Sequence, residues 1–257
     1  MDYNFCSKIT KNIDFVLHQA AMSSIQECQE NITEAYQMNV FSFINILKAS
    51  EINCVKKFVY ASSSSIYKST LKLVNENATI KPISDYGNTK LINEIIAENS
   101  FKKIKKIGLR YFNIYGIGQK LKKNGAVIPT WIDSILNGKK IIIKGKNVLR
   151  DFCYVDDVIQ ANINSCLVEQ DKNHLVLNIA SGKKTYLEKL LRIIEIKVDK
   201  KSKIVKKPLN INEIPCSIAN INLAKKKIKF KPKFNLDKGI DRLVNYIRRN
   251  KEKIKYV

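Results

Sequence analysis

The sequence predicts an α/β fold built around a parallel β-sheet. Short apolar runs with the character of buried strands alternate with longer segments whose apolar residues recur at helical spacing. Three of the expected strands end in polar or small residues, as strands of an open parallel sheet do where chemistry takes place. From about residue 117 onward the alternation becomes less regular, which indicates a second unit in the C-terminal half.

The expected strands are short apolar runs bounded by polar residues, and several include the loop that follows. They cover residues 13–21, 56–67, 106–116, 139–145 and 175–181. The parallel arrangement places the ends of the first three strands, with their polar residues, at one end of the sheet.

The expected helices are longer segments with apolar residues three and four positions apart. They cover residues 31–52, 85–100, 126–138, 155–169, 185–196 and about 237–252. Gly138 is a natural helix stop, and Thr185 is expected to cap the helix that follows it. Segment 197–235 is rich in lysine and predicted to be irregular, with its charge run solvated.

Length and composition fit one large globular domain or two small ones. The chain has 257 residues, of which 45% are hydrophobic and 27% are charged. It contains no run of 18 apolar residues, and residues 1–15 lack the apolar core of a secretion signal, so we expect a cytoplasmic protein without a membrane span. The six cysteines are scattered without a C-x-x-C motif, which argues for reduced thiols and against a disulfide framework or a metal site.

The formal net charge of +23 is the one extreme value. Such a charge is typical of proteins that bind nucleic acid. Here the excess comes from lysine spread along the whole chain, whereas a dedicated phosphate-binding face more often uses arginine interleaved with aromatic residues. We therefore favour compositional drift and do not expect a nucleic-acid partner. A non-catalytic nucleic-acid-binding protein remains the alternative from another class.

Residues 84–91, SDYGNTKL, place Tyr86 and Lys90 four apart, on one face of a helix. In a chain with 11 tyrosines and 46 basic residues such a pair arises by chance. Its position is more informative, because it follows a predicted strand that ends in the four serines 62–65. A strand, a serine cluster and then Tyr-x-x-x-Lys in the first turns of a helix form a far more specific pattern.

Several blocks in order resemble the extended short-chain dehydrogenase/reductase family of nucleotide-sugar epimerases and dehydratases. The blocks are DFVLHQAA, FINILKAS, YASSSSIY, GLRYFNIYG, AVIPTWI and RDFCYVDDVIQANI. The resemblance covers about residues 12–245 and looks closest to the bacterial UDP-N-acetylglucosamine 4-epimerases of O-antigen and capsule synthesis. It implies a Rossmann-like doubly wound parallel sheet, a smaller C-terminal α/β substrate-binding domain, and NAD as cofactor.

The resemblance also implies a catalytic group of Tyr86, Lys90 and Ser63. In this family the tyrosine acts as a phenolate base on the 4-hydroxyl of the sugar, although the ordinary pKa of tyrosine, about 10, is too high for work at neutral pH. The Lys90 ammonium, together with the positive nicotinamide ring, is expected to lower that pKa and to bind the nicotinamide ribose. Ser63 matches the serine that hydrogen-bonds the reacting hydroxyl. The C4 hydride would pass to NAD and return to the opposite face of the sugar, so NAD is retained.

Other residues match binding positions of the family. The positions expected to hold the cofactor are Ala20, Ala21, Asn39 and Tyr111, besides Tyr86 and Lys90. The positions expected to hold the substrate are Ser24, Asn113, Trp131 and Arg150, besides Ser63. A guanidinium such as that of Arg150 suits the UDP diphosphate. Simple close packing explains the two alanines equally well.

The chain departs from the family pattern in one large respect. It has nine glycines and no Gly-x-x-Gly-x-x-Gly, the turn that holds the NAD pyrophosphate at a helix N-terminus in this family. Roughly the first 70–80 residues of a family member are therefore missing, either because the true start lies upstream or because the chain is a remnant.

We accordingly expect residues 1–116 to form a partial NAD-binding Rossmann domain without its first βαβ unit. Residues 117–257 would form mainly the substrate-binding domain, with about 146–170 returning to the first domain. The first remaining strand would have a free edge, and the 257 residues alone would bind NAD weakly.

The function that this pattern favours is a 4-epimerase that interconverts UDP-GlcNAc and UDP-GalNAc, or UDP-glucose and UDP-galactose, in polysaccharide precursor synthesis. A UDP-glucuronate epimerase and a 4,6-dehydratase are the neighbouring alternatives. Dehydratases usually carry an Asp-Glu pair beside the serine turn, which SSSSIY lacks. By resemblance we also expect a homodimer formed through the helices at 31–52 and 85–100.

Overall fold

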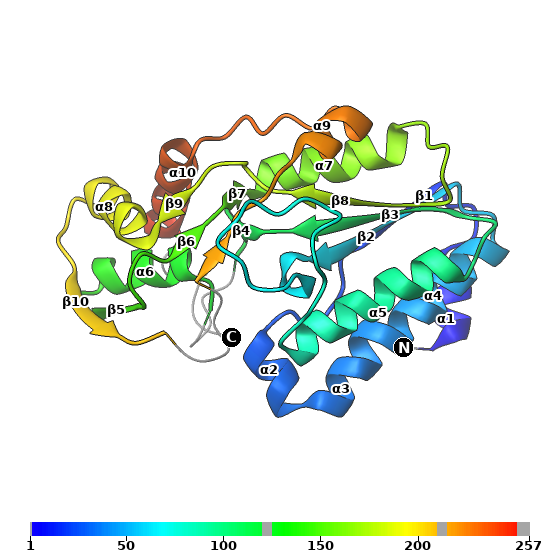
Figure 1. The fold of residues 1–257 in the computed structure, drawn as a ribbon, viewed down its shortest axis with the longest axis horizontal. Coiled ribbons are helices and arrows are strands. Elements are labelled where there is room, and N and C mark those ends of the chain that lie inside the picture. The colour runs from blue at the N-terminus through cyan, green and yellow to red at the C-terminus, as the bar shows by residue number, and fades with distance from the viewer. Residues whose placement is uncertain (1, 120–124, 210–214, 251–257) are drawn as a thin grey trace.

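The centre of the protein is a four-stranded, fully parallel sheet (Figure 1). The computed structural model describes residues 2–119, 125–209 and 215–250. The strands in spatial order are β1 (Phe15–His18), β2 (Lys57–Ser63), β3 (Lys105–Tyr111) and β8 (His174–Ile179). The central strands β2 and β3 are buried over most of their length, as expected for a parallel sheet that is covered on both faces.

Helices pack on both faces of this sheet (Figure 1). One face carries α1 (Tyr3–Ile9), α4 (Ser42–Ile52) and α5 (Asp85–Asn99), and the other carries α7 (Val155–Leu167) and α9 (Asn222–Ile228). This is the doubly wound, Rossmann-like arrangement that the sequence predicted.

The predicted helix at 31–52 is one helical segment with a π-helical turn in its middle. It consists of α3 (Ile32–Tyr36), η1 (Gln37–Phe41) and α4. A π turn inside an α-helix is frequently found at functional sites. Here it carries Asn39, which is buried against the loop after β1 and against α5.

The C-terminal part of the chain builds a second hydrophobic cluster, which lies on the left in Figure 1. Its elements are α6 (Val127–Leu136), β5 (Lys140–Lys144), α8 (Leu187–Val198), β10 (Lys203–Lys207) and α10 (Leu236–Arg249). β5 and β10 form a parallel pair, and apolar residues from one side of each helix fill the space beside them. Residues 251–252, the predicted end of the last helix, lie outside the described residues.

Several short elements complete the fold. They are α2 (Ile25–Glu30), the 3₁₀ turn η2 (Ser64–Ile66), β4 (Asn113–Tyr115), β6 (Leu149–Arg150), β7 (Phe152–Tyr154), β9 (Thr185–Tyr186) and β11 (Cys216–Ser217). β4 pairs with β7, and β6 lies between β9 and β11. α7, which follows β7, packs on the central sheet.

Two details of the predicted secondary structure were wrong. Thr185 does not cap a helix: it pairs with Arg150 in β9, and α8 begins at Leu187. Segment 197–235 is not irregular, since it contains β10, β11 and α9. Its buried apolar residues, such as Ile228 and Phe230, are separated by exposed lysines, and this mixture conceals the helical and strand patterns.

Strand β1 forms an open edge of the sheet. Within the described part of the chain it pairs only with β2, so the backbone groups on its outer side have no strand partner. Apolar side chains near this edge are exposed, among them Phe15 and Leu17 of β1 and Phe5 and Ile9 of α1. The free edge expected from the sequence is therefore present, and its apolar surface is unusual for a strand of a parallel sheet.

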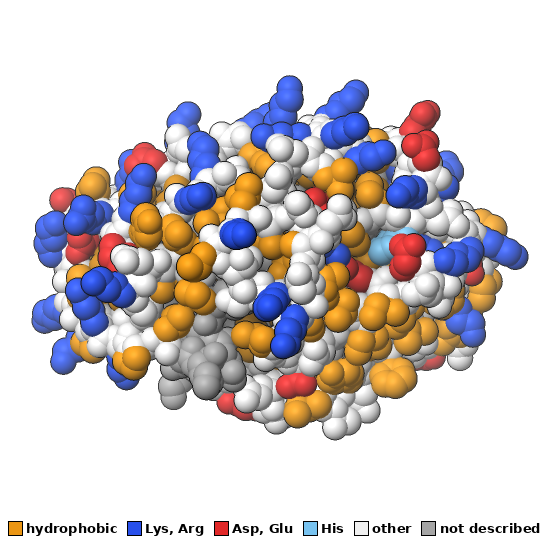
Figure 2. Space-filling view, in the orientation of Figure 1, with side chains coloured by type: hydrophobic (Ala, Val, Ile, Leu, Met, Phe, Trp, Pro, Cys, Tyr) orange, Lys and Arg blue, Asp and Glu red, His pale blue; other side chains and the backbone are white. Residues whose placement is uncertain are grey.

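Charge and apolar surface are unevenly distributed (Figure 2). Lysines project along the upper margin in this view, where α9 contributes the exposed Lys225, Lys226 and Lys227. Hydrophobic side chains gather at the lower right, where α4 and α5 lie. Among the helices of the described ranges, none is long and apolar enough to cross a membrane.

Candidate active site

The carboxyl end of β2 and the start of α5 meet in a group of polar side chains. Ser63 is the last residue of β2, and Tyr86 lies in the first turn of α5. The Ser84 hydroxyl caps this helix by accepting a hydrogen bond from the Gly87 amide at 3.2 Å, which fixes the start of α5 and therefore the place of Tyr86. Gly87 itself packs against the Ser65 carbonyl, so a side chain at this position would push the helix away from the serine turn.

The structure brings together the three residues predicted to be catalytic. The Ser63 and Tyr86 side chains are close enough to interact, and this contact acts to lower the pKa of Tyr86. Lys90 lies one turn further along α5, with its Nζ 5.7 Å from the centre of the Tyr86 ring. The same Nζ donates a hydrogen bond to the Ala61 carbonyl at 3.0 Å, which holds the ammonium beneath the phenol.

Burial dominates the protonation of this pair. It lowers the pKa of Lys90 to about 8 and raises the pKa of Tyr86, while the hydrogen bond from Ser63 acts in the opposite direction on the tyrosine. The expectation from the sequence was that Lys90 and the positive nicotinamide ring together lower the pKa of Tyr86. In the chain by itself the direction is upward, because removing the phenolate from water outweighs the favourable contacts.

Asn39 connects the loop after β1 to α5. Its Oδ1 accepts from the Met22 amide at 2.7 Å, and its Nδ2 donates to the Met22 carbonyl at 3.0 Å and to the Thr89 hydroxyl at 3.1 Å. Asn93 of α5 donates to the Asn39 carbonyl at 2.9 Å, within the π turn. Asn39 therefore supports the walls of the site through both its side chain and its backbone.

A second polar group lies beside Tyr111 at the end of β3. The Tyr111 hydroxyl donates to Gln19 at 3.0 Å and accepts from Asn162 of α7 at 2.8 Å, and Gln19 also donates to Asn162 at 3.1 Å. Next to Gln19, Ala20 is exposed and Ala21 is partly exposed. The sequence analysis missed Gln19 and Asn162, although both stand inside the matched blocks HQAA and DDVIQANI.

Asn113 contacts a buried aspartate, Asp151, which directly follows Arg150 in the chain. Asn113 Nδ2 donates to the Asp151 carbonyl at 3.1 Å. The Asp151 carboxylate accepts from the backbone and hydroxyl of Ser181 at 2.8 and 2.6 Å and from the Gly182 amide at 3.0 Å. Asp151 thus holds the loop after β8 against the strand that carries Arg150. Asp151 is a third residue that the sequence analysis missed, although it follows Arg150 directly in the RDF block.

The two remaining predicted substrate residues have structural contacts. Ser24 caps α2, because its hydroxyl accepts from the Glu27 amide at 3.2 Å. Trp131 is buried in the second hydrophobic cluster, on α6. Neither residue contacts Ser63, Tyr86 or Lys90 through any of the hydrogen bonds described above, so their roles in substrate binding remain predictions.

Residues 1–180 match the NAD dependent epimerase/dehydratase family. The chain belongs to this family. It is 34% identical over 245 residues to a Methanocaldococcus jannaschii protein that carries a provisional UDP-glucose 4-epimerase name, covering 93% of this chain and 79% of that protein.

Solved structures of related proteins agree with this assignment. The Thermotoga maritima UDP-glucose 4-epimerase with UDP-glucose is 27% identical with a TM-score of 0.91, and the match covers 97% of this chain and 82% of that one. A UDP-N-acetylglucosamine 4-epimerase from Methanobrevibacter ruminantium, in complex with UDP-N-acetylmuramic acid, is 29% identical with a TM-score of 0.88, covering 95% and 80%.

NAD is the cofactor of the family, and the described site fits one end of it. Tyr86 and Lys90 stand at the carboxyl end of the sheet, and the small exposed Ala20 leaves the neighbouring backbone open to a close approach. These residues would hold the nicotinamide end. The 257 residues contain no Gly-x-x-Gly-x-x-Gly to receive the pyrophosphate.

Proposed function

We propose that this protein is a nucleotide-sugar 4-epimerase that acts at Tyr86. The observation that carries the proposal is the joint placement of Ser63, Tyr86 and Lys90 at the carboxyl end of the parallel sheet. Membership of the NAD dependent epimerase/dehydratase family supports it, as do the solved epimerases of the same fold.

In the proposed reaction Tyr86 takes the proton from the 4-hydroxyl of the sugar and later returns it. Ser63, whose side chain lies beside Tyr86, orients that hydroxyl. When bound, NAD supplies a reversible acceptor for the C4 hydride. The Lys90 ammonium stabilises the phenolate; its pKa of about 8 keeps it mostly protonated at neutral pH. The positive charge of the oxidised cofactor is expected to lower the raised pKa of Tyr86 into the working range.

We propose UDP-GlcNAc and UDP-GalNAc as the substrate pair, in the synthesis of polysaccharide precursors. The match of the sequence blocks to the UDP-N-acetylglucosamine group supports this choice over UDP-glucose and UDP-glucuronate. Arg150 and Asn113 are proposed to bind the diphosphate side of the substrate. The two residues are close in the fold, because Asn113 donates to the carbonyl of Asp151, the residue after Arg150, and pairs with Phe152 of β7.

Conversion of nucleotide sugars tests the proposal. The purified 257-residue protein is incubated with UDP-GlcNAc and millimolar NAD, and UDP-GalNAc is followed by proton NMR. UDP-glucose and UDP-glucuronate are assayed in parallel, and Tyr86→Phe serves as the inactive control. We expect conversion of UDP-GlcNAc that depends on Tyr86. Epimerisation of none of the three sugars would overturn the proposed function, and conversion of only UDP-glucose or UDP-glucuronate would correct the substrate.

We further propose that the protein forms a homodimer through α3, η1, α4 and α5. Large apolar side chains on these elements are exposed, including Ile32, Phe41, Ile52 and Ile95, and hydrophobic side chains gather over this region in Figure 2. Sedimentation velocity of the wild type and of Phe41→Glu tests this proposal. A monomeric wild type would contradict it.

A further inference from the structure

Three side-chain contacts connect the end of β2 to α5. Tyr86, Lys90 and Glu94 are four residues apart on α5 and face the sheet. Each meets one residue of segment 61–63 at the end of β2. The pairs are Lys90 with Ala61, Glu94 with Ser62, and Tyr86 with Ser63. These three contacts therefore fix the position of the strand end relative to the helix, and these two elements carry the proposed catalytic group.

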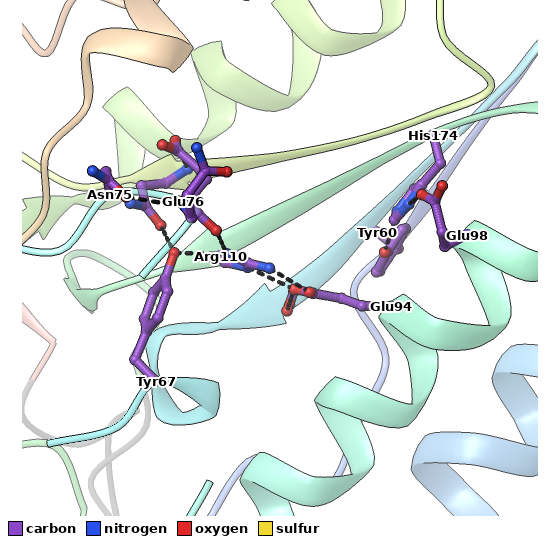
Figure 3. A network of polar contacts seen from close by, with 11 residues as sticks. Tyr60, Tyr67, Asn75, Glu76, Glu94, Glu98, Arg110 and His174 are labelled. Atoms are coloured by element: carbon purple, nitrogen blue, oxygen red, sulfur yellow. Dashed lines mark hydrogen bonds and ion pairs between the residues drawn. The ribbon is translucent and has the colours of Figure 1, made fainter. Parts of the chain in front are cut away.

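Of these three contacts, the one made by Glu94 is part of a buried ion pair (Figure 3). Its Oε1 accepts from the Ser62 hydroxyl at 2.5 Å and from Arg110 Nε at 2.9 Å, and its Oε2 accepts from Arg110 Nη2 at 2.7 Å. The side chains of Arg110 and Glu94 are only 3% and 7% exposed. This is a buried, bidentate ion pair, and Glu94 makes one further hydrogen bond to Ser62 at the strand end.

Arg110 extends the network to the other side of the serine turn. Its Nη1 donates to the Tyr67 hydroxyl at 2.8 Å and to the Glu76 carbonyl at 2.8 Å. Tyr67 directly follows η2, the turn that contains Ser64–Ile66, and its hydroxyl donates to Asn178 of β8 at 2.7 Å. Arg110 and Tyr67 come from different strands and loops but meet in one buried group in Figure 3.

A single ion pair thus holds both ends of the segment that carries Ser63. Glu94 binds Ser62, just before it, and Arg110 binds Tyr67, just after the turn. Within the segment the Ser63 hydroxyl also accepts from the Ser65 amide at 3.1 Å. The two outer contacts fix where this turn lies relative to α5, and therefore where the Ser63 hydroxyl lies relative to Tyr86.

Stability alone is a poor reason for such a pair. The desolvation of two buried charges often cancels their attraction, and well-packed apolar residues of similar volume are frequently as stable. What apolar residues cannot provide is directional contact with a hydroxyl on each side of the turn. We propose that Glu94 and Arg110 are positioning residues that hold Ser63 against Tyr86, an inference that rests on the proposed function of that site.

The next turn of α5 offers a matched control. Glu98 contacts His174 Nδ1 at 2.7 Å, and His174 Nε2 contacts the Tyr60 hydroxyl at 2.8 Å (Figure 3). This relay also joins α5 to β2 and β8, but it touches neither the serine turn nor Tyr86. Glu98→Gln therefore perturbs the same helix without changing the contacts that Glu94 and Arg110 make on either side of the serine turn.

The test compares Glu94→Leu/Arg110→Met with Glu98→Gln. The double variant replaces both charges with apolar side chains and is expected to fold. At saturating NAD we expect its kcat for sugar conversion to fall about 100-fold, with the KM for the UDP-sugar within about twofold of wild type, because a small misplacement affects the chemical step more than binding. Glu98→Gln should keep the wild-type kcat.

A spectroscopic measurement tests, independently of turnover, whether Glu94 and Arg110 hold Ser63 next to Tyr86. Tyrosines are labelled with ¹³C at Cζ, and the Tyr86 resonance is assigned by its absence in Tyr86→Phe. We expect this resonance to move in the double variant, because the contact between Tyr86 and Ser63 changes, and to stay in place in Glu98→Gln. If the wild type converts no UDP-sugar, the proposed function fails, while the Tyr86 resonance still decides the positioning role.

Ser62→Ala is the second variant if the double variant does not fold. It removes only the contact between Glu94 and the strand end, and we expect kcat to fall about tenfold, as for loss of one hydrogen bond to a charged group. A folded variant of either kind with wild-type kcat and an unmoved Tyr86 resonance would overturn the proposal.

Discussion

Two parts of the same sheet differ sharply in how they are held. At the end of β2 and β3, Ser62, Tyr67, Glu94 and Arg110 form one buried network, and the Glu94–Arg110 pair connects strands, helix and turn. At β1, one side of the strand is unpaired within the described residues, and its apolar Leu17 is 47% exposed. The nearby ion pair of Lys56 with Asp14 is on the surface.

The difference predicts that the catalytic geometry and the binding of the cofactor can be perturbed separately. The residues that would carry out proton transfer depend on α5, β2 and β3. We call this part of the molecule the closed side, because β2 and β3 each have a strand partner on both edges. The residues that would approach the rest of NAD lie toward β1 and the loop after it, where the sheet is open. Substitutions on the two sides should therefore have different consequences.

The largest difference in stability is expected between the two ion pairs. Arg110→Met leaves the Glu94 carboxylate buried without its partner and should lower the free energy of unfolding by about 3–5 kcal/mol. Lys56→Met removes an exposed partner of Asp14 and should cost at most about 1 kcal/mol. Urea unfolding of the two variants measures both values, and equal losses would show that the closed side is not held by this pair.

Tyr86→Phe should separate chemistry from folding on the closed side. Loss of the phenol hydroxyl removes the proposed base, so turnover at saturating NAD should fall about 10²–10⁴-fold. Circular dichroism and the midpoint of thermal unfolding should stay close to those of the wild type. Tyr246→Phe, in the second hydrophobic cluster, is the control and should retain turnover. A Tyr86→Phe protein with normal turnover would exclude this residue as the base.

Lys90 gives the closed side a pH dependence. Its pKa falls from 10.5 to about 8 on burial, so between these values the unfolded chain keeps a proton that the folded chain has lost. Rising pH across this window therefore stabilises the folded wild type by about 3 kcal/mol relative to Lys90→Met, which cannot titrate there. Urea unfolding of both proteins at pH 7 to 10.5 measures this change. A difference between them that is constant with pH would contradict the burial effect.

The smallest effect is expected at the open edge. Leu17→Lys places a charge on an exposed edge strand, which should change the free energy of unfolding by less than about 1 kcal/mol and reduce self-association through β1. Leu109→Ala, in the buried centre of β3, should cost about 2–5 kcal/mol by comparison. Thermal unfolding and light scattering distinguish the two, and a large loss in Leu17→Lys would mean that the edge is not free.

The fold was largely predictable from local patterns and from the family resemblance. Apolar runs located β2, β3 and β8, and the matched sequence blocks led to the prediction, still untested, that Ser63, Tyr86 and Lys90 form a catalytic group, which the structure places side by side. The free edge at β1 followed from the absence of the glycine-rich turn. These features are encoded in short stretches of sequence, where spacing and composition reflect the structure directly.

The supporting contacts were not predictable in the same way. Glu94 resembles an ordinary charged residue of a helix surface, and its partner Arg110 is 16 residues away in the chain. Gln19 and Asn162 are 143 residues apart. Such pairs arise only when the sheet brings distant strands and helices together. The exposed lysines around Ile228 hid α9 for a simpler reason, since they masked its few buried residues.

Calorimetric titration of the 257-residue protein with NAD is the most direct test of whether the catalytic geometry is independent of the affinity for the cofactor. We expect a dissociation constant weaker than about 100 μM, corresponding to less than about 5.5 kcal/mol of binding free energy. Turnover at millimolar NAD should nonetheless depend on Tyr86. Tight binding with a dissociation constant in the low micromolar range would contradict the view that the closed side holds the chemistry while the open side leaves the cofactor weakly held.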